Sequence, residues 1–333
     1  MKKYIPSSER YTNMTYNKCG ESGLKLPAIS LGLWHNFGKN ENYENMKNMC
    51  MTAFDSGITH FDLANNYGYP DIGSAEENFG KILKDCFFRY RNELVISSKA
   101  GYRMWDGPYG DFGSRKYLIS SLDDSLMRLG IDYVDIFYHH RMDPDTPLEE
   151  TMGALDQIVK SGMGIYAGLS NYDGPTMERA AKILDSLNCP FVINQNRYSI
   201  FDRNVENNGI LDSAKKLGKG MIIFSPLAQG LLTNRYLNDI PKDSRIKTSG
   251  IFLKESNLAP KVLEKITALN DVAIGRGETL AQMALLWLLK KETITSVLIG
   301  ASSSEQIREN VGVINGKDFT KEELDLIDEI ALS

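Results

Sequence analysis

Residues 134–170 read VDIFYHHRMDPDTPLEETMGALDQIVKSGMGIYAGLS. An apolar run at 134–139 is followed by a polar turn, a helical pattern over 149–161 and a second apolar run at 165–170. Short runs rich in β-branched and aromatic residues predict buried strands, and apolar residues at three- and four-residue spacing predict a helix. Two such strands with a helix between them pair in parallel through a right-handed crossover. This stretch therefore predicts an α/β fold.

The same alternation continues along almost the whole chain. Strands are predicted at 28–34, 59–64, 94–99, 134–139, 165–170, 191–194, 221–225 and 296–299, and helices near 44–56, 75–85, 115–129, 149–161, 175–187, 205–217, 259–275 and 304–314. Both a closed barrel and a doubly wound sheet fit this order. A doubly wound dinucleotide-binding sheet requires G-x-G-x-x-G after an early strand, and none is present. Eight units in a chain of this length favour a (β/α)8 TIM barrel.

Three further features lie outside the eight units. Two short strands around the turn at 20–23 predict an N-terminal β-hairpin that caps one end of the barrel. Two extra helices are predicted at 279–291 and 320–331. Residues 232–258 have no clear periodicity and follow the seventh strand, so they are expected at the C-terminal face, where barrel enzymes build their sites. The whole chain, 1–333, is predicted to form a single barrel domain.

Composition and charge restrict the function. The formal net charge of −5 is spread along the chain without a basic stripe, so nucleic-acid binding is not indicated. The N-terminus lacks the apolar centre of a secretory signal, and the apolar run at 283–289 is too short to cross a bilayer. None of the four cysteines has CxxC spacing, which gives no zinc or thioredoxin-like signature. A cytoplasmic protein with reduced thiols and no metal is expected.

Four polar residues follow three successive predicted strands. Asp62 lies near the end of the second strand and Tyr67 follows it, Lys99 ends the third and His140 directly follows the fourth. The C-terminal ends of barrel strands meet at one mouth, so these side chains are expected to converge there. Neighbouring residues of a strand face opposite sides, so only one of His139 and His140 can point into the mouth.

This combination fits proton transfer to a carbonyl oxygen. A phenol has an unperturbed pKa of about 10, and a nearby ammonium is expected to lower the pKa of Tyr67. A carboxylate at Asp62 keeps the Lys99 ammonium charged and in place, and a histidine donates a hydrogen bond to the carbonyl.

Each residue also has a simpler interpretation. A lone aspartate or lysine at a strand end more often forms a loop salt bridge, and a lone tyrosine most often packs. His35 and His60 have no special partner in the sequence and are interpreted as structural. Lys99 could alternatively form a Schiff base in a barrel aldolase. The ordered combination on three strands favours the proton-transfer hypothesis.

Several long motifs resemble the aldo-keto reductase superfamily. Residues 60–68, HFDLANNYG, are similar to the family's Asp-and-Tyr signature, and 73–78, GSAEEN, continue it. Residues 128–141 resemble the strand that bears the family histidine, whose spacing from Asp135 selects His140 over His139. Residues 224–233, 240–245 and 299–310 resemble the branch that contains bacterial L-glyceraldehyde 3-phosphate reductases and voltage-gated potassium channel beta subunits. The resemblance extends from about residue 16 to 330.

The resemblance implies a nicotinamide cofactor. The residues expected to contact it are Leu33, Trp34, Asp62, Ser170, Asn171, Gln195, Phe224, Ser225, Pro226, Leu227, Ala228, Gln229, Arg235, Arg245, Gly300, Ala301, Ser302, Gln306, Glu309 and Asn310. Many family members carry a Lys and an Arg for the 2′-phosphate where this chain has Ala301 and Gln306. That task would move to Arg235, Arg245 and the hydroxyls of 302–304. The resemblance therefore favours NADP over NAD.

The resemblance also implies the substrate class. It suggests NADPH-dependent reduction of small aldehydes or ketones, such as L-glyceraldehyde 3-phosphate or methylglyoxal. Trp34, Tyr67, His140 and Arg141 are expected to contact the substrate. Tyr102, Arg103, Trp105 and Tyr198 lie where substrate-loop residues are expected, and Arg141 or Arg103 could hold a phosphate or be salt-bridged to the protein.

The same branch implies an alternative function and an oligomeric state. The alternative function is a cofactor-binding regulatory or redox-sensing subunit that resembles the channel beta subunits, in which the position matching His140 is an asparagine. The branch often assembles as homo-tetramers or homo-octamers, and a homo-oligomer is expected here.

Overall fold

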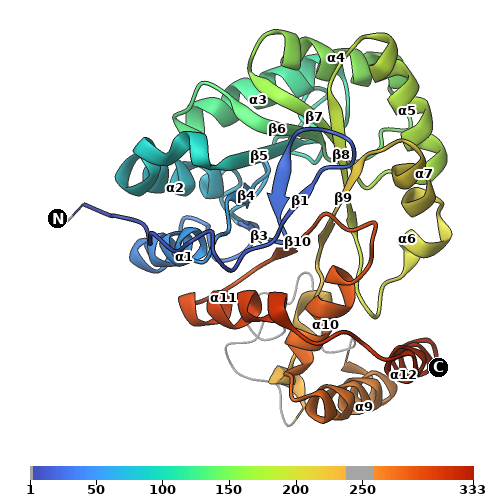
Figure 1. Cartoon of the computed structure of the whole chain (residues 1–333). Coiled ribbons are helices and arrows are strands. Elements are labelled where there is room, and N and C mark those ends of the chain that lie inside the picture. The colour runs from blue at the N-terminus through green and yellow to red at the C-terminus, as the bar shows by residue number, and fades with distance from the viewer. Residues whose placement is uncertain (1–2, 238–257) are drawn as a thin grey trace.

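The predicted strands close into a parallel barrel in this computed structural model, which describes residues 3–237 and 258–333. The strand order is β10-β3-β4-β5-β6-β7-β8-β9, and Figure 1 shows the barrel surrounded by its helices. Its strands are β3(Ile29–Gly32), β4(His60–Asp62), β5(Val95–Ala100), β6(Val134–His139), β7(Gly164–Ser170), β8(Phe191–Arg197), β9(Gly220–Phe224) and β10(Ser296–Ile299). The (β/α)8 prediction is confirmed.

Most predicted helices are present. They are α1(Tyr43–Asp55), α2(Ser74–Ile82), α3(Arg115–Leu129), α4(Leu148–Lys160), α5(Gly174–Ser186), α9(Pro260–Arg276) and α11(Ser304–Val311), with α10(Leu280–Leu289) and α12(Lys321–Leu332) as the two extra helices. Both extra helices begin with a reciprocal capping box, made by Thr279 with Gln282 and by Thr320 with Glu323. Within the described part of the chain, no helix combines the length and apolar character that crossing a membrane requires.

The prediction of one continuous helix at 205–217 is wrong. The segment divides into α6(Asn204–Asn207) and α7(Ile210–Lys216), with Gly209 between them at φ 76°. A positive φ of this size cannot continue a right-handed helix. The break brings the Gly209 carbonyl against the start of α5, where the backbone of Gly174 donates a hydrogen bond to the Asn208 carbonyl at 3.0 Å.

The N-terminal hairpin, β1(Tyr16–Lys18) and β2(Lys25–Pro27), covers the N-terminal end of the barrel. The Glu21 amide donates to the Gly218 carbonyl at 2.9 Å, and the Asn17 side chain donates to the Thr295 carbonyl at 2.9 Å. Gly218 lies two residues before β9 and Thr295 lies one residue before β10, so the hairpin closes the end opposite the mouth. At Gly20, with φ 56°, an added Cβ would lie 1.9 Å from the Gly218 carbonyl oxygen, so only glycine fits.

One strand is longer than predicted. The sixth predicted strand, 191–194, corresponds to β8, which continues to Arg197. Asn194, Gln195 and Asn196 are all buried. Gln195 faces the barrel interior, where it donates to Asp62, whereas Asn194 and Asn196 face the helix layer, where Asn194 donates to Asn196 and Asn196 donates to the Tyr172 carbonyl. Polar residues can therefore continue this strand, because both of its faces offer buried hydrogen-bond partners.

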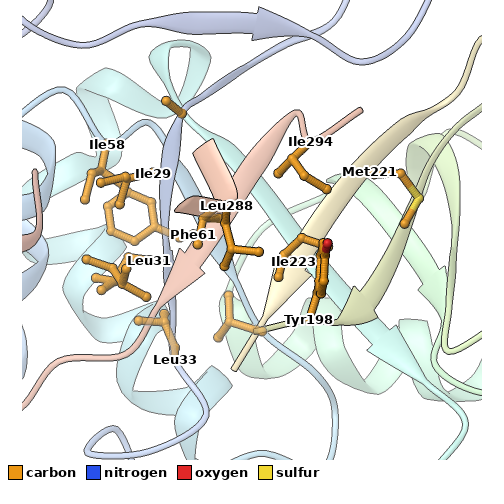
Figure 2. Close-up of a cluster of buried hydrophobic side chains, with 14 of the residues drawn as sticks. Ile29, Leu31, Leu33, Ile58, Phe61, Tyr198, Met221, Ile223, Leu288 and Ile294 are labelled. Carbon is orange, nitrogen blue, oxygen red and sulfur yellow. The ribbon is translucent and has the colours of Figure 1, made fainter. Parts of the chain in front are cut away.

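The apolar core lies between the strands and the outer helices. Figure 2 shows Leu31, Phe61 and Ile223 from three barrel strands near Leu288 of α10. Tyr198 belongs to this same cluster and is completely buried, with its ring 5.3 Å from that of Trp287. Its hydroxyl donates to Glu206. The expectation that Tyr198 lies in a substrate loop is therefore wrong.

Candidate active site

Three of the predicted catalytic side chains form one hydrogen-bonded group at the C-terminal end of the barrel. The Lys99 ammonium donates to Asp62 Oδ2 at 2.5 Å and to the Leu63 carbonyl at 2.6 Å. It also lies 3.4 Å from the Tyr67 hydroxyl. The pairing of β4 with β5 sets Asp62 opposite Ser97, two residues from Lys99, and this register brings the carboxylate and the ammonium together.

Because both side chains are buried, the folded protein needs this ion pair for its stability as well. The side chains of Lys99 and Asp62 are 0% and 3% exposed. Burial lowers the pKa of Lys99, while the charge and hydrogen bond of Asp62 raise it. A buried ion needs a close partner, so each of these two groups stabilises the charged form of the other.

The expected direction of the Tyr67 pKa shift is wrong. Burial raises the pKa of Tyr67 well above its ordinary value, and the negative charge of Asp62 adds to that rise. The ammonium of Lys99 was expected to dominate, but desolvation of the phenolate is the larger effect here. Tyr67 therefore holds its proton at neutral pH, which suits a donor rather than an acceptor.

His140 faces the same mouth as a neutral ring. Its ring centroid lies 6.0 Å from that of Tyr67 and 4.6 Å from that of Tyr102, which meets it edge to face. Burial lowers the pKa of His140 well below its ordinary value, and the nearby charge of Lys99 lowers it further. Among the described residues, its Nδ1 has no hydrogen-bond partner. A neutral imidazole in this place can donate one hydrogen bond to a ligand.

His139 points away from the mouth, as strand geometry predicts. Its Nδ1 lies 2.7 Å from the Tyr172 hydroxyl, and the ring is completely buried. Burial lowers the pKa of His139 to about 4 and has the same effect on His60, whose pKa is also about 4.

Acid is expected to destabilise the fold through these two histidines. Their folded-state pKa of about 4 lies below the 6.5 of an unperturbed histidine, so the unfolded chain binds more protons between these values. Stability is therefore complete above pH 6.5 and falls as the pH drops toward 4, by up to about 1.4 kcal/mol per pH unit for each histidine. Urea unfolding measured at about pH 7.5 and about pH 5.5 tests this.

The variant His139→Gln serves as the matched comparison, because it removes one of the two titrating rings. It is expected to lose about 1.4 kcal/mol less than the wild type over that interval. Equal losses in the two proteins would show that His139 is not buried in its neutral form.

The ends of β7 and β8 carry three residues that were predicted to bind a carboxamide. Ser170 and Gln195 are paired in the sheet and buried, and Asn171 follows them at φ 58°. The Asn171 side chain donates to the His140 carbonyl at 2.9 Å, and Gln195 Nε2 donates to Asp62 Oδ1 at 3.1 Å. Gln195 therefore joins the hydrogen-bonded group around Lys99, while Asn171 connects Ser170 to the backbone of His140.

The segment after β9 has an unusual backbone. Ser225, Ala228 and Gln229 have φ angles of 54°, 48° and 62°. With Asn171, they account for four of the seven non-glycine residues that have positive φ in the described chain. Such residues cluster at ligand-binding sites because the surrounding structure must hold them there. The segment from Phe224 through Pro226 and Leu227 to Gln229 is thus preshaped.

A second preshaped segment precedes α11. The side chains of Asn36 and Asn45 donate to the carbonyls of Ala301 and Ser302 at 2.8 and 3.0 Å. The Ser302 amide donates to Gln306 Oε1 at 2.8 Å, and Ser303 caps the helix. This holds the backbone at the positive end of the helix dipole, where an anion is favoured.

The remaining residues that were predicted to contact the cofactor differ in how exposed they are. Leu33 is buried beside the partly exposed Trp34, whose ring lies 6.3 Å from that of Tyr67. Gly300 and Glu309 are exposed, and Asn310 is buried. Arg235 lies in a short helical turn, Asn234–Tyr236, after β9. Arg245 lies outside the described residues.

Arg141 is tied to the loop that follows β5. Its Nε donates to the Gly101 carbonyl at 2.8 Å, and its Nη2 lies 2.7 Å from Asp111 Oδ1. The guanidinium carbon lies 4.5 Å from the Tyr102 ring centroid and 4.2 Å from that of Phe112. A substrate anion would therefore compete with Asp111 for Arg141, a partner that sequence spacing did not reveal.

Arg103 and Trp105 lie farther along the same loop. Arg103 pairs with Asp106, with both side chains largely exposed. The Trp105 ring lies 5.7 Å from that of Tyr117 and is 40% exposed. Both side chains are therefore available at the rim of the site, and Arg103 is held only by an exposed ion pair, which contributes little stability.

Comparison with known proteins adds family information. The model of the aldo/keto reductase family matches residues 28–332. The chain is 52% identical over 331 residues to an L-glyceraldehyde 3-phosphate reductase of Escherichia coli O157:H7, which covers 98% of this chain and 95% of the relative. It is 34% identical over 307 residues to a probable voltage-gated potassium channel subunit beta of Arabidopsis thaliana, covering 91% and 92%. A putative subunit of the same kind from Schizosaccharomyces pombe is 36% identical over 330 residues, covering 96% and 93%.

Proposed function

This chain belongs to the aldo/keto reductase family, and from that premise we propose that it is an enzyme that reduces small aldehydes or ketones with NADPH. The observation that carries the proposal is the buried Lys99–Asp62 pair, 2.5 Å apart, beside the Tyr67 hydroxyl. His140 completes the group as a neutral hydrogen-bond donor.

The cofactor would supply the hydride from its nicotinamide ring. Trp34 and Phe224 are partly exposed and offer apolar surface for the ring, with Leu33 buried beside Trp34. Asn171, Ser170 and Gln195 carry amide and hydroxyl groups that complement a carboxamide. The preshaped segment 224–229 and the start of α11 suit the phosphates. We assign recognition of a 2′-phosphate to Arg235, Arg245 and the hydroxyls of 302–304, with Gly300, Ala301, Gln306, Glu309 and Asn310 around the adenosine.

The protein's own residues handle the proton. Tyr67 retains its proton at neutral pH and gives it to the substrate oxygen as negative charge develops there. The Lys99 ammonium stabilises the phenolate that remains, and Asp62 keeps that ammonium charged. His140 donates a hydrogen bond that orients the carbonyl.

The substrate proposal rests on the relatives and on the rim of the site. A reductase of L-glyceraldehyde 3-phosphate is 52% identical to this chain, so we propose a small aldehyde of that kind, or methylglyoxal, as substrate. Arg141 and Arg103 are the cations near the mouth that could receive a phosphate. Arg103 is the more accessible of the two, since Arg141 is held by Asp111 and by the Gly101 carbonyl.

The first test is oxidation of NADPH, followed by its absorbance, with a panel of small aldehydes and with NADH in parallel. Turnover is expected, and Arg235→Ala is expected to raise the KM for NADPH about tenfold while leaving that for NADH unchanged, because only NADPH carries the 2′-phosphate. An equal rise in the KM for NADPH and for NADH would show that Arg235 does not recognise the 2′-phosphate.

The same experiment distinguishes the reductase from the alternative function. The similarity to potassium channel beta subunits, at 34% and 36% identity, favours a cofactor-binding regulatory or redox-sensing subunit as the second candidate. Tight NADPH binding without turnover on any aldehyde would support that role. We also propose a homo-tetramer or homo-octamer, which the molar mass from light scattering tests.

A further inference from the structure

His60 lies in a chain of buried hydrogen bonds that runs from strand to strand along one side of the barrel. Ser296 Oγ lies 2.6 Å from Ser30 Oγ, which lies 2.9 Å from His60 Nδ1. On the other side of the ring, His60 Nε2 lies 2.9 Å from Ser97 Oγ, and Ser97 donates to Asp62 Oδ1 at 2.7 Å. All five side chains belong to buried residues of four neighbouring strands, β10, β3, β4 and β5.

The Asp62 carboxylate at one end of this chain fixes the direction of every hydrogen bond in it. A carboxylate only accepts hydrogen bonds, so the Ser97 hydroxyl proton must point at Asp62. The Ser97 oxygen then accepts from His60, which places the ring proton on Nε2. Neutral histidine carries one ring proton, so Nδ1 accepts from Ser30. His60 is thereby restricted to the Nε2–H tautomer.

We propose that His60 is a positioning residue for the reduction: through Ser97 it orients the Asp62 carboxylate, and through Asp62 it sets the place of the Lys99 ammonium beside Tyr67. This inference rests on the function proposed above. His60, interpreted from the sequence as structural, would then belong to the support of the active site.

The two oxygens of Asp62 explain why this support matters. Oδ2 meets Lys99 at 2.5 Å, while Oδ1 accepts from Ser97 at 2.7 Å and from Gln195 at 3.1 Å. Donors on Oδ1 prevent the carboxylate from rotating about its own axis. Without the donor from Ser97, Oδ1 keeps only the longer bond from Gln195, so the carboxylate can turn further. The ammonium is then held less closely at its distance of 3.4 Å from the Tyr67 hydroxyl. Aligned hydrogen bonds also strengthen one another in a buried chain.

Two substitutions at His60 separate its two ring nitrogens. The amide of His60→Gln reaches about as far as Nε2 and can donate to Ser97, whereas the amide of His60→Asn reaches only the position of Nδ1 and can bond Ser30 alone. The variant Ser97→Ala breaks the same connection from the other side with a smaller change in volume.

Ser98→Ala is the matched control. Ser98 is the next residue on β5, is equally buried and also donates to a carboxylate, Glu76 Oε1, at 2.5 Å. It faces the helix layer instead of the barrel interior. A loss of activity that merely follows the loss of a buried serine hydrogen bond would therefore appear in this variant too.

The expected result is a selective loss of kcat. His60→Asn and Ser97→Ala are each expected to lower kcat by about 5- to 100-fold, with the Kd for NADPH unchanged. The double variant loses no more than the worse single variant, because both changes break the same connection from His60 through Ser97 to Asp62. His60→Gln regains most of the activity, and Ser98→Ala stays within about twofold of the wild type.

Additive losses in the double variant, or wild-type kcat in His60→Asn, would overturn the proposal. An inactive wild type would instead contradict the proposed function, and the direction of the hydrogen bonds is then tested without turnover. NMR of protein labelled with 15N-histidine is expected to show His60 as the Nε2–H tautomer. The Nδ1–H tautomer, or a mixture of both, would refute the chain as described.

Discussion

Tyr67→Phe is expected to lower kcat for aldehyde reduction by about 1,000-fold while NADPH binds as tightly as to the wild type. The substitution removes only the hydroxyl that lies 3.4 Å from the Lys99 ammonium, and the ring keeps its place between Trp34 and His140. Proton transfer by a positioned group typically contributes factors of this size. Steady-state kinetics with fluorescence titration of NADPH measures both quantities.

Tyr16→Phe is the control for loss of a phenol hydroxyl. Tyr16 donates to the Gly57 carbonyl at 2.7 Å, in the hairpin at the opposite end of the barrel. This variant is expected to lose about 1 kcal/mol of stability and to keep its kcat. Wild-type turnover by Tyr67→Phe would contradict the proposed proton donor and direct attention to His140.

Lys99→Met is expected to lower the free energy of unfolding by about 3–5 kcal/mol and to abolish turnover. The side chains of Lys99 and Asp62 are 0% and 3% exposed, so the variant leaves a carboxylate buried without its cation. Urea unfolding measures the change in stability, and NADPH oxidation measures the change in activity.

The double variant Lys99→Met/Asp62→Asn distinguishes an uncompensated charge from a lost packing contact. Removing both charges is expected to recover most of the stability and none of the activity. Lys215→Met serves as the exposed control: Lys215 pairs with Glu292 at 3.2 Å, and the two side chains are 66% and 86% exposed, so stability should change by less than about 1 kcal/mol. A double variant as unstable as Lys99→Met would show that packing dominates.

The sequence alone predicted the barrel and the convergence of the proposed catalytic residues, because both depend on local patterns. Strand and helix periodicities repeat within short windows, and eight such units predict the closed barrel that forms. Asp62, Tyr67 and Lys99 converge because each follows or ends a strand, and strands of a barrel end at one mouth. His140 follows from the same rule.

Long-range packing explains what the sequence did not reveal about individual residues. Tyr198 was expected near the substrate, yet it packs against Trp287, and this contact joins β8 to a helix near the end of the chain. Arg141 contacts Asp111, which lies 30 positions away in the sequence. The expected fall in the Tyr67 pKa was wrong because it considered the charge of Lys99 and not the burial of the phenol.

His60 shows most clearly the difference between what local sequence predicts and what the tertiary structure adds. Its sequence neighbours, Thr59 and Phe61, carry no sign of the hydrogen-bond chain, since Ser30 and Ser97 come from other strands and Ser296 lies 266 positions from Ser30. The sequence by itself determined which elements form and in which order they pair, because those follow from local periodicity. Only the tertiary structure decided which buried groups bond one another and which pKa values rise or fall, because hydrogen bonds and desolvation depend on neighbours that closure of the barrel brings together.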